Sequence, residues 1–152
     1  MGYIVRTVNC FQHVKEIVSL HNEVWKNSPG IIDLLASSTE CFIAVRDKPG
    51  PVVGYAFLQK DRGRGFYELN DIAVNARERG KGCGSMLMAH MMATMDRIKL
   101  CARAGNREVL SFYWKLGFKE EGVFENYYDV GQDAVRMAWD RKDAVPPEPD
   151  FS

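Results

Sequence analysis

Three glycines at alternating positions, Gly80, Gly82 and Gly84, separate an apolar stretch that ends at Val74 from a Met- and Leu-rich stretch that begins at Ser85. This order predicts a strand, a tight turn and a helix. A turn of this kind gathers backbone N–H groups at the positive end of a helix dipole, and glycine lets an anion approach the backbone. The sequence therefore predicts an anion site over residues 79–85; the alternative is a tight turn that only needs flexible residues.

Two well-known phosphate loops do not fit this stretch. The dinucleotide pattern G-x-G-x-x-G needs a glycine where the chain has Ser85, and the Walker pattern needs Ser or Thr after a lysine, whereas Gly82 follows Lys81. What remains is Arg79, two residues, Gly82, one residue and Gly84, placed directly after a strand.

The composition limits the classes of partner. The chain has 152 residues, which suits one domain, and its formal net charge is zero. A neutral chain has no general attraction for nucleic acid or acidic membranes, so we expect neither as a partner. The first residues are strand-like and show no signal pattern, and no apolar run reaches membrane-spanning length. We therefore expect a cytoplasmic protein, either a monomer or a homodimer.

Cysteine and histidine are too few and too scattered for a structural metal site. The chain has four cysteines and three histidines, and the cysteines form no C-x-x-C pair. They are typical of free thiols in a reducing compartment. We expect no bound metal.

The elements that must position the turn follow from hydrophobic spacing and turn residues. The pattern predicts an α/β fold in the order β-α-α-β-β-β-α-β-α-β-β, with a central mixed sheet and helices on both faces. Strands are expected over residues 3–8, 41–46, 52–59, 66–74, 98–102, from 118 and over 134–139, and helices over 14–25, 31–36, from 85 and over 107–116.

Several residues should delimit or fill these elements. Asn9 is expected to cap the first helical segment, where Val14, Ile17, Val18, His21 and Trp25 recur at helical spacing. Breaks are expected at residues 28–30, 48–50 and 62–65. The stripe formed by Leu87, Met88, Met91, Met92 and Met95 indicates core packing. We expect one domain over residues 1–143 and a disordered, proline-rich tail over 144–152.

A second pattern runs from Asn106 through Phe112-Tyr113 to Gly117-Phe118. Together with the glycine turn, and at the spacing found between them, it resembles the GNAT superfamily of acetyl-CoA-dependent N-acetyltransferases. The resemblance covers residues 4–139. It implies a single GNAT domain, acetyl-CoA as the co-substrate, an amine as the acceptor, and direct attack of the amine in a ternary complex.

The resemblance also implies how acetyl-CoA is held. The pantetheine arm would pair with the edge of the strand that contains Ile72, Ala73 and Val74, and the amide of Ile72 would face the acetyl carbonyl. The side chains of Ile72 and Val74 can pack in the core at the same time. Asn106 matches a position that contacts the same arm. The pyrophosphate would be received by the turn formed by Arg79, Gly80, Lys81, Gly82, Cys83, Gly84 and Ser85.

Two residues are expected to carry the proton transfers. Tyr113 matches the general acid, because a phenol with a pKa near ~10 is protonated at neutral pH and can donate to a leaving thiolate. Its alternative role is a core tyrosine. Glu68 lies six residues before Val74, where the histone-acetylating branch carries its base. Alternation places Glu68 on one strand face with Asn70 and Ile72, unless a bulge changes the count. Asp71, or a water chain ending on it, is the alternative base.

The acceptor is expected to be a peptide or protein amine. The segment that contains Tyr127 and Tyr128 resembles enzymes that acetylate protein N-termini, including those of ribosomal proteins, in which it contacts the first peptide residues. Asn70 and Trp25 are expected to line the same site. The chain departs from the bacterial ribosomal-protein enzymes, which have a glutamate where this chain has Cys101 and no acid at the position of Glu68.

Three alternatives remain open. The acceptor can be a small amine such as a polyamine, an amino acid or an aminoglycoside. The chain can be a non-catalytic CoA-binding regulatory module, although the presence of both Glu68 and Tyr113 argues against it. A nucleotide- or RNA-binding domain is disfavoured by the zero net charge.

Overall fold

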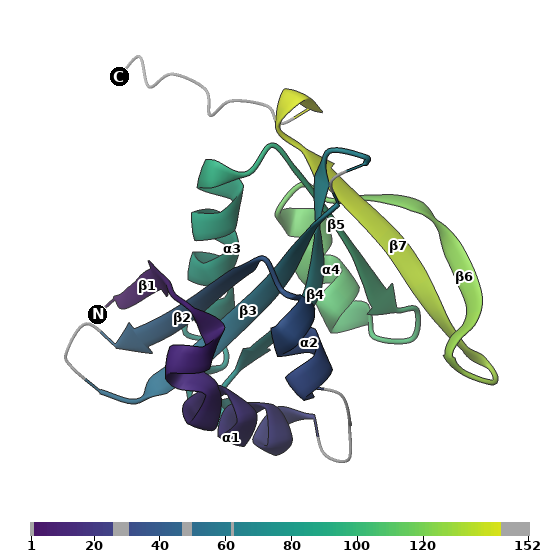
Figure 1. Cartoon of the computed structure of the whole chain (residues 1–152). Helices are drawn as coiled ribbons and strands as arrows, with labels where there is room; N and C mark the ends of the chain where they lie inside the picture. Colours follow the sequence, from purple (N-terminus) through teal and green to yellow (C-terminus); the bar gives the residue numbers. More distant parts are fainter. Residues whose placement is uncertain (1, 26–30, 47–49, 62, 144–152) are drawn as a thin grey trace, which may run out of the picture. The chain divides into compact units, whose positions relative to one another are not determined.

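The computed structural model describes residues 2–25, 31–46, 50–61 and 63–143, shown in Figure 1. The chain folds as two compact units, residues 1–95 and 96–152. The expected breaks at 28–30, 48–49 and Arg62 and the expected tail at 144–152 lie outside the described residues. The single domain over residues 1–143 stays a prediction. Within the described ranges, no helix combines the length and the apolar character needed to cross a membrane.

The first unit is an antiparallel sheet with helices on both faces. The strands follow one another in space as they do in the sequence, and β1 pairs with β2, β2 with β3 and β3 with β4. The side chain of Asn9 accepts a hydrogen bond from the Phe11 amide and caps a short 3-10 turn, which confirms the expected cap. The elements are β1 (Tyr3–Thr7), α1 (Val14–Val24), α2 (Ile31–Ser37), β2 (Glu40–Arg46), β3 (Val52–Asp61), β4 (Phe66–Val74) and α3 (Cys83–Thr94).

Helices α1 and α2 cover one face of this sheet. Ile17 and Leu20 of α1 and Leu35 of α2 join Tyr55 and Phe57 of β3 in one buried apolar cluster. The spacing of the apolar residues on α1 therefore gives the helix a single buried stripe, as expected of an amphipathic helix.

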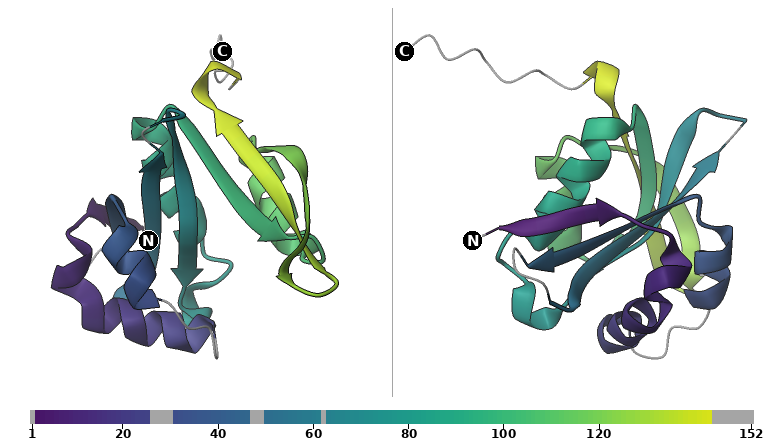
Figure 2. Two further views of the ribbon diagram at one scale, coloured as in Figure 1. Left: turned by 45° about the vertical axis from the view of Figure 1, so that its right-hand side comes forward. Right: turned by 60° about the vertical axis from the view of Figure 1, so that its left-hand side comes forward.

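Helix α3 covers the opposite face, as the views in Figure 2 show. Its Leu87, Met88 and Met91 are fully buried, which confirms the expectation that the methionine stripe is core. The helix lies close to the sheet at Gly54 of β3. A Cβ atom at Gly54 would lie 3.0 Å from the Cys83 sulfur and 3.2 Å from a Leu87 methyl carbon. Glycine at position 54 is thus what allows α3 to approach.

Over its described residues, 96–143, the second unit forms a three-stranded antiparallel sheet with one α-helix. Strand β7 lies between β5 and β6 and pairs with both. Asn106 caps α4 by accepting a hydrogen bond from the Val109 amide, and Gly117, with φ at 100°, follows the helix end. The elements are β5 (Arg97–Arg103), α4 (Arg107–Lys115), β6 (Lys119–Asp129) and β7 (Gln132–Asp140). The element order predicted from the sequence is therefore confirmed across both units.

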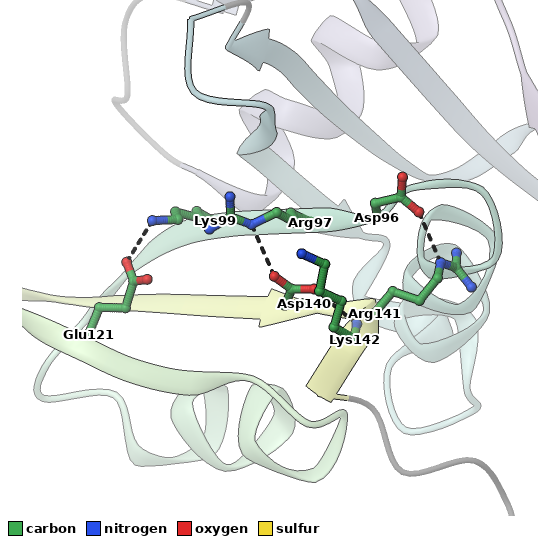
Figure 3. Close-up of polar contacts among 7 residues, drawn as sticks. All are labelled: Asp96, Arg97, Lys99, Glu121, Asp140, Arg141 and Lys142. Carbon is green, nitrogen blue, oxygen red and sulfur yellow. Dashed lines mark hydrogen bonds and ion pairs between the residues drawn. The ribbon is translucent and has the colours of Figure 1, made fainter.

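Ion pairs at the solvent side tie these strands together (Figure 3). Arg97 on β5 pairs with Asp140 on β7 at 3.1 Å, and Lys99 on β5 pairs with Glu121 on β6 at 3.1 Å. The chain leaves β7 with Arg141 paired to Asp96 at 3.2 Å. Pairs of this partly exposed kind contribute about 0–1 kcal/mol each to stability.

Candidate active site

The glycine turn between β4 and α3 has the backbone that the sequence predicts. Gly80 and Gly82 have φ angles of 76° and 91°, in the region that L side chains disfavour. Gly82 is also the N-cap of α3, which starts at Cys83, two residues before the expected start. Gly82 has no side chain to cap the helix. The first amides of α3 therefore receive no side-chain cap and lie at the positive end of the dipole.

Glu78 fixes the segment that leads into this turn. Its side chain is 5% exposed and accepts hydrogen bonds from the Tyr3 hydroxyl at 2.7 Å and from Arg46 Nε at 2.8 Å. Both donors come from strands on the far side of the sheet, β1 and β2. The hydrogen bond from Tyr3, with smaller contributions from Arg46 and Lys81, lowers the pKa of Glu78 against the opposing effect of burial. No local sequence pattern predicts this contact, because its partners lie 75 and 32 residues away along the chain.

The thiol of Cys83, the first residue of α3, is turned into the core. It is 1% exposed, and burial raises its pKa to about 11. Any contribution of Cys83 to an anion site is therefore made by its backbone amide rather than by its side chain.

The end of β4 presents backbone groups away from β3. The Asn75 amide donates to the Val53 carbonyl at 2.8 Å, and the register continues as Val74 with Gly54, Ala73 with Tyr55 and Ile72 with Ala56. In an antiparallel ladder, hydrogen-bonded and non-hydrogen-bonded pairs alternate. The N–H and C=O groups of Ile72 and Val74 consequently point away from β3.

A bulge in β4 changes which carboxylates share a face. Phe57 pairs with Asp71 but Leu58 pairs with Leu69, so Asn70 is an extra residue without a partner in the β3–β4 register. Glu68 then lies on the same face as Asp71, whereas simple alternation places it with Asn70 and Ile72. The expectation based on alternation is wrong for this reason. Glu68 and Asn70 are both half-buried.

Asp71 is held by two residues, Tyr55 and His21, that were not among the predicted site residues. The Tyr55 hydroxyl donates to Asp71 Oδ2 at 2.8 Å, and His21 Nδ1 lies 3.1 Å from the same oxygen and 2.9 Å from the Tyr55 oxygen. Tyr55 is fully buried and His21 is 3% exposed. We call His21, Tyr55 and Asp71 the carboxylate cluster.

Opposing effects act on the carboxylate of Asp71. Burial is the largest and raises its pKa, whereas hydrogen bonds from Tyr55, His21 and Trp25 lower it without cancelling the rise. Burial also raises the pKa of Tyr55, as does its proximity to Asp71. Tyr55 therefore stays protonated and remains a donor. The sequence contained one indication of this cluster. His21 lies in an apolar helical stripe, and a buried histidine needs a hydrogen-bond partner.

Trp25 lies at the end of α1, where its amide donates to the His21 carbonyl at 2.7 Å. Its side chain is 42% exposed, and it also hydrogen-bonds to Asp71 and Tyr55. The side chain thus connects the carboxylate cluster with the surface. The neighbouring residues 26–30 lie outside the described residues.

The remaining predicted residues belong to the second unit. Tyr113 on α4 is buried and contacts the rings of Phe112 and Phe118 edge-on, with centroids 5.2 Å and 5.4 Å away. Tyr127 and Tyr128 on β6 contact each other edge-on at 5.0 Å and are 55% and 36% exposed.

The aromatic pair of β6 has a charged neighbour. The Arg103 guanidinium lies 4.2 Å from the ring centre of Tyr128. Burial is the main cause that raises the pKa of Tyr128 to about 12. This tyrosine is therefore a neutral hydrogen-bonding group at physiological pH, with a large apolar surface beside it.

In the first unit, Asp71 and the bulge lie on β4, and the glycine turn follows β4 along the chain. Asn106, Tyr113, Tyr127 and Tyr128 lie in the second unit. Among the described residues, no group of three or more His, Cys, Asp or Glu side chains could hold a metal ion.

Comparison with known proteins identifies the family. A model of the acetyltransferase (GNAT) domain matches residues 37–120. An N-alpha-acetyltransferase of Sulfurisphaera tokodaii is 37% identical over 117 residues, which are 65% of this chain and 69% of that protein.

Solved structures share the fold over most of the chain. The ribosomal-protein-S18-alanine N-acetyltransferase of Escherichia coli has a TM-score of 0.80 at 19% identity, covering 99% of this chain and 100% of that one. Arabidopsis thaliana Naa50, solved with the bisubstrate analogue CoA-Ac-MVNAL, has a TM-score of 0.76 at 21% identity, covering 91% and 99%.

The chain belongs to the GNAT acetyltransferase family and is an acetyl-CoA-dependent N-acetyltransferase. The predicted α/β fold class is confirmed. The resemblance that the glycine turn and the Asn106–Phe118 segment indicated is confirmed as well.

Proposed function

We propose that this enzyme transfers the acetyl group of acetyl-CoA to the α-amine at the N-terminus of a peptide or protein. The observation that carries the acetyl-CoA site is the turn with Gly80 and Gly82 at positive φ, directly before α3. The similarity to the N-alpha-acetyltransferase of Sulfurisphaera tokodaii supports the choice of acceptor. The Naa50 complex shows that this fold accommodates a peptide joined to CoA.

In this proposal, backbone groups hold the co-substrate. The amides from Arg79 to Ser85 receive the pyrophosphate, and the exposed side chains of Arg79 and Lys81 add positive charge. The outward-facing groups of Ile72 and Val74 pair with the pantetheine arm, as a further strand would. Asn106 contacts the same arm while its side-chain oxygen caps α4.

Bound acetyl-CoA supplies an acetyl thioester, and the residues of this chain supply orientation and proton transfer. The Ile72 amide polarises the carbonyl. Tyr113 donates a proton to the leaving sulfur. A carboxylate of β4 accepts the proton of the amine: Glu68 by resemblance, or Asp71 as the alternative. Trp25, Asn70, Tyr127 and Tyr128 contact the acceptor.

The strength of the base that is needed depends on the acceptor. At pH 7, deprotonating a lysine amine with a pKa near ~10.4 costs about 4–5 kcal/mol, whereas an α-amine with a pKa near ~8 costs only about 1–1.5 kcal/mol. A partly buried carboxylate reached directly or through water is sufficient for an α-amine. This difference favours an N-terminal acceptor over a side-chain lysine.

An acceptor screen tests the proposal, with CoA release as the readout. It compares peptides with a free N-terminus, the same peptides blocked at the N-terminus but containing lysine, and a panel of polyamines, amino acids and aminoglycosides. We expect the highest kcat/KM for free N-termini. A higher value for a small amine would shift the function to the small-molecule alternative. Acetyl-CoA binding without turnover on any amine would indicate the non-catalytic module.

A further inference from the structure

With Asp71 ionised, the distances in the carboxylate cluster allow one arrangement of protons. The single Tyr55 O–H is used in the 2.8 Å bond to Asp71 Oδ2, so the Tyr55 oxygen can only accept from His21 Nδ1. Nδ1 therefore carries a hydrogen, which it shares between the Tyr55 oxygen and Asp71 Oδ2 at 2.9 Å and 3.1 Å. Two donors thus converge on one carboxylate oxygen.

This convergence has a chemical consequence for Asp71. Hydrogen bonds donated to a carboxylate favour its ionised form, and an oxygen that already accepts two donors is a poor place for a proton. His21 and Tyr55 therefore orient the carboxyl group through Oδ2, and Trp25 adds a further hydrogen bond to the same group.

The position of Asp71 on β4 is also suited to the reaction. It immediately precedes Ile72, whose amide points away from β3 and is proposed to face the acetyl carbonyl. Glu68 lies four residues before Ile72, and the bulge at Asn70 lies between them. A base must reach the amine at hydrogen-bond distance or through one water, so Asp71 is the better placed of the two.

We propose that Asp71 binds the acceptor ammonium and accepts its proton, and that His21 and Tyr55 are positioning residues that hold its carboxyl group in place. The inference rests on the proposed function. The ammonium gives one proton to Asp71, and the neutral nitrogen then bonds to the acetyl carbon as the carbon–sulfur bond breaks. The sulfur takes the proton of Tyr113, Tyr113 regains one from the new amide nitrogen, and Asp71 releases its proton to water.

The groups that surround Asp71 define the expected pH behaviour. His21 and Trp25 face it from α1 and its end, Tyr55 faces it from β3, and Glu68 shares its face on β4. The charged residues of α1 are exposed, as is Asp33 on α2. The acidic limb of kcat/KM should consequently report the carboxylate cluster.

The test measures kcat/KM against pH with the peptide Met-Val-Asn-Ala-Leu and with spermidine, for the wild type, Asp71→Asn and Tyr55→Phe. We expect Asp71→Asn to lose about 100-fold in kcat/KM while acetyl-CoA affinity in calorimetry changes less than about threefold. Tyr55→Phe removes one donor from Oδ2, so the acidic limb should move to higher pH with the plateau nearly retained. Carbon-13 NMR titration of the Asp71 carboxyl group should show that its pKa is higher in Tyr55→Phe than in the wild type.

The matched controls are Asp33→Asn, an exposed aspartate on α2, and Tyr67→Phe, a tyrosine on β4 beside Lys60. Both should leave the pH profile unchanged. A folded Asp71→Asn variant with wild-type kcat/KM would overturn the inference. So would a Tyr55→Phe variant that loses thermal stability but keeps the wild-type acidic limb, because that result describes a structural role only. If the wild type acetylates no amine in the screen, the proposed function itself fails.

Discussion

Tyr113 is a buried phenol whose ring is held by its aromatic neighbours. Phe112 and Phe118 contact it edge-on at 5.2 Å and 5.4 Å, and these contacts do not depend on the hydroxyl. Replacing Tyr113 by Phe thus removes a proton donor and leaves the ring packing in place.

We expect Tyr113→Phe to lower kcat by about 100-fold, because general acid catalysis contributes about 10²–10⁴-fold. Acetyl-CoA affinity should stay nearly the same, and the loss of a buried hydroxyl should cost about 1 kcal/mol of stability. Stopped-flow measurement of the chemical step, calorimetry and a thermal melt check these values, with Tyr67→Phe as the control. An unchanged chemical step would remove Tyr113 from the acid role.

The roles of some site residues could be predicted from the sequence, and the roles of others could not. The turn glycines and Asn106 were identified because their role follows from a local pattern. His21 and Tyr55 were not, because they lie 34 residues apart and meet only once α1 packs on the sheet. Glu68 and Asp71 could be proposed as bases, but the bulge at Asn70 decides which face Glu68 occupies.

The turn between β4 and α3 is an element whose backbone is itself the proposed binding group. At Gly82, φ is 91° and a Cβ would meet nothing within 4 Å. A side chain there has space, but it strains the backbone by about 1–2 kcal/mol and stands where the anion is expected to approach.

Gly82→Val should therefore weaken acetyl-CoA binding at least about tenfold, which corresponds to about 1.4 kcal/mol. Calorimetry measures the change. The matched control is Gly122→Val on β6, where φ is not positive and a Cβ also meets nothing within 4 Å. Equal affinity for the Gly82 variant and the control would mean that the phosphates bind elsewhere.

The contact between α3 and β3 yields a prediction about stability. Gly54→Ala places a Cβ 3.0 Å from the Cys83 sulfur and 3.3 Å from the Ala73 carbonyl oxygen. We expect a loss of about 1–3 kcal/mol, typical of an overpacked core, measured by urea unfolding against Gly122→Ala. A variant as stable as the control would show that α3 shifts without cost.

At the scale of the molecule, Glu78 ties the first two strands to the segment before the glycine turn. Its pKa is lowered, chiefly by the hydrogen bond from Tyr3. The unfolded state therefore binds the proton more readily than the folded state. The contribution of Glu78 to stability is present above the unfolded pKa of about 4.3 and is lost as the pH falls through the folded value.

We accordingly expect Glu78→Gln to reduce the loss of stability that accompanies acidification from pH 7 to pH 3. Denaturant unfolding at a series of pH values measures this, and Glu120→Gln, an exposed glutamate on β6, is the control. The account of Glu78 fails if the pH dependence of the Gln variant matches that of the wild type.

The element order of the whole chain could be predicted from its sequence, because apolar spacing, glycines and caps act locally. The family followed from two segments at the right separation. Strand register, the bulge in β4 and the two buried clusters around Asp71 and Glu78 could not be predicted, because they depend on contacts between distant segments.

The central claim is that the glycine turn binds the diphosphate of acetyl-CoA. A crystal structure of the enzyme with acetyl-CoA tests it most directly. The claim predicts diphosphate oxygens about 3 Å from the backbone nitrogens of the turn, residues 79–85, with the thioester beside Ile72. Acetyl-CoA bound at another place, with the turn empty, would contradict the claim and the chemistry built on it.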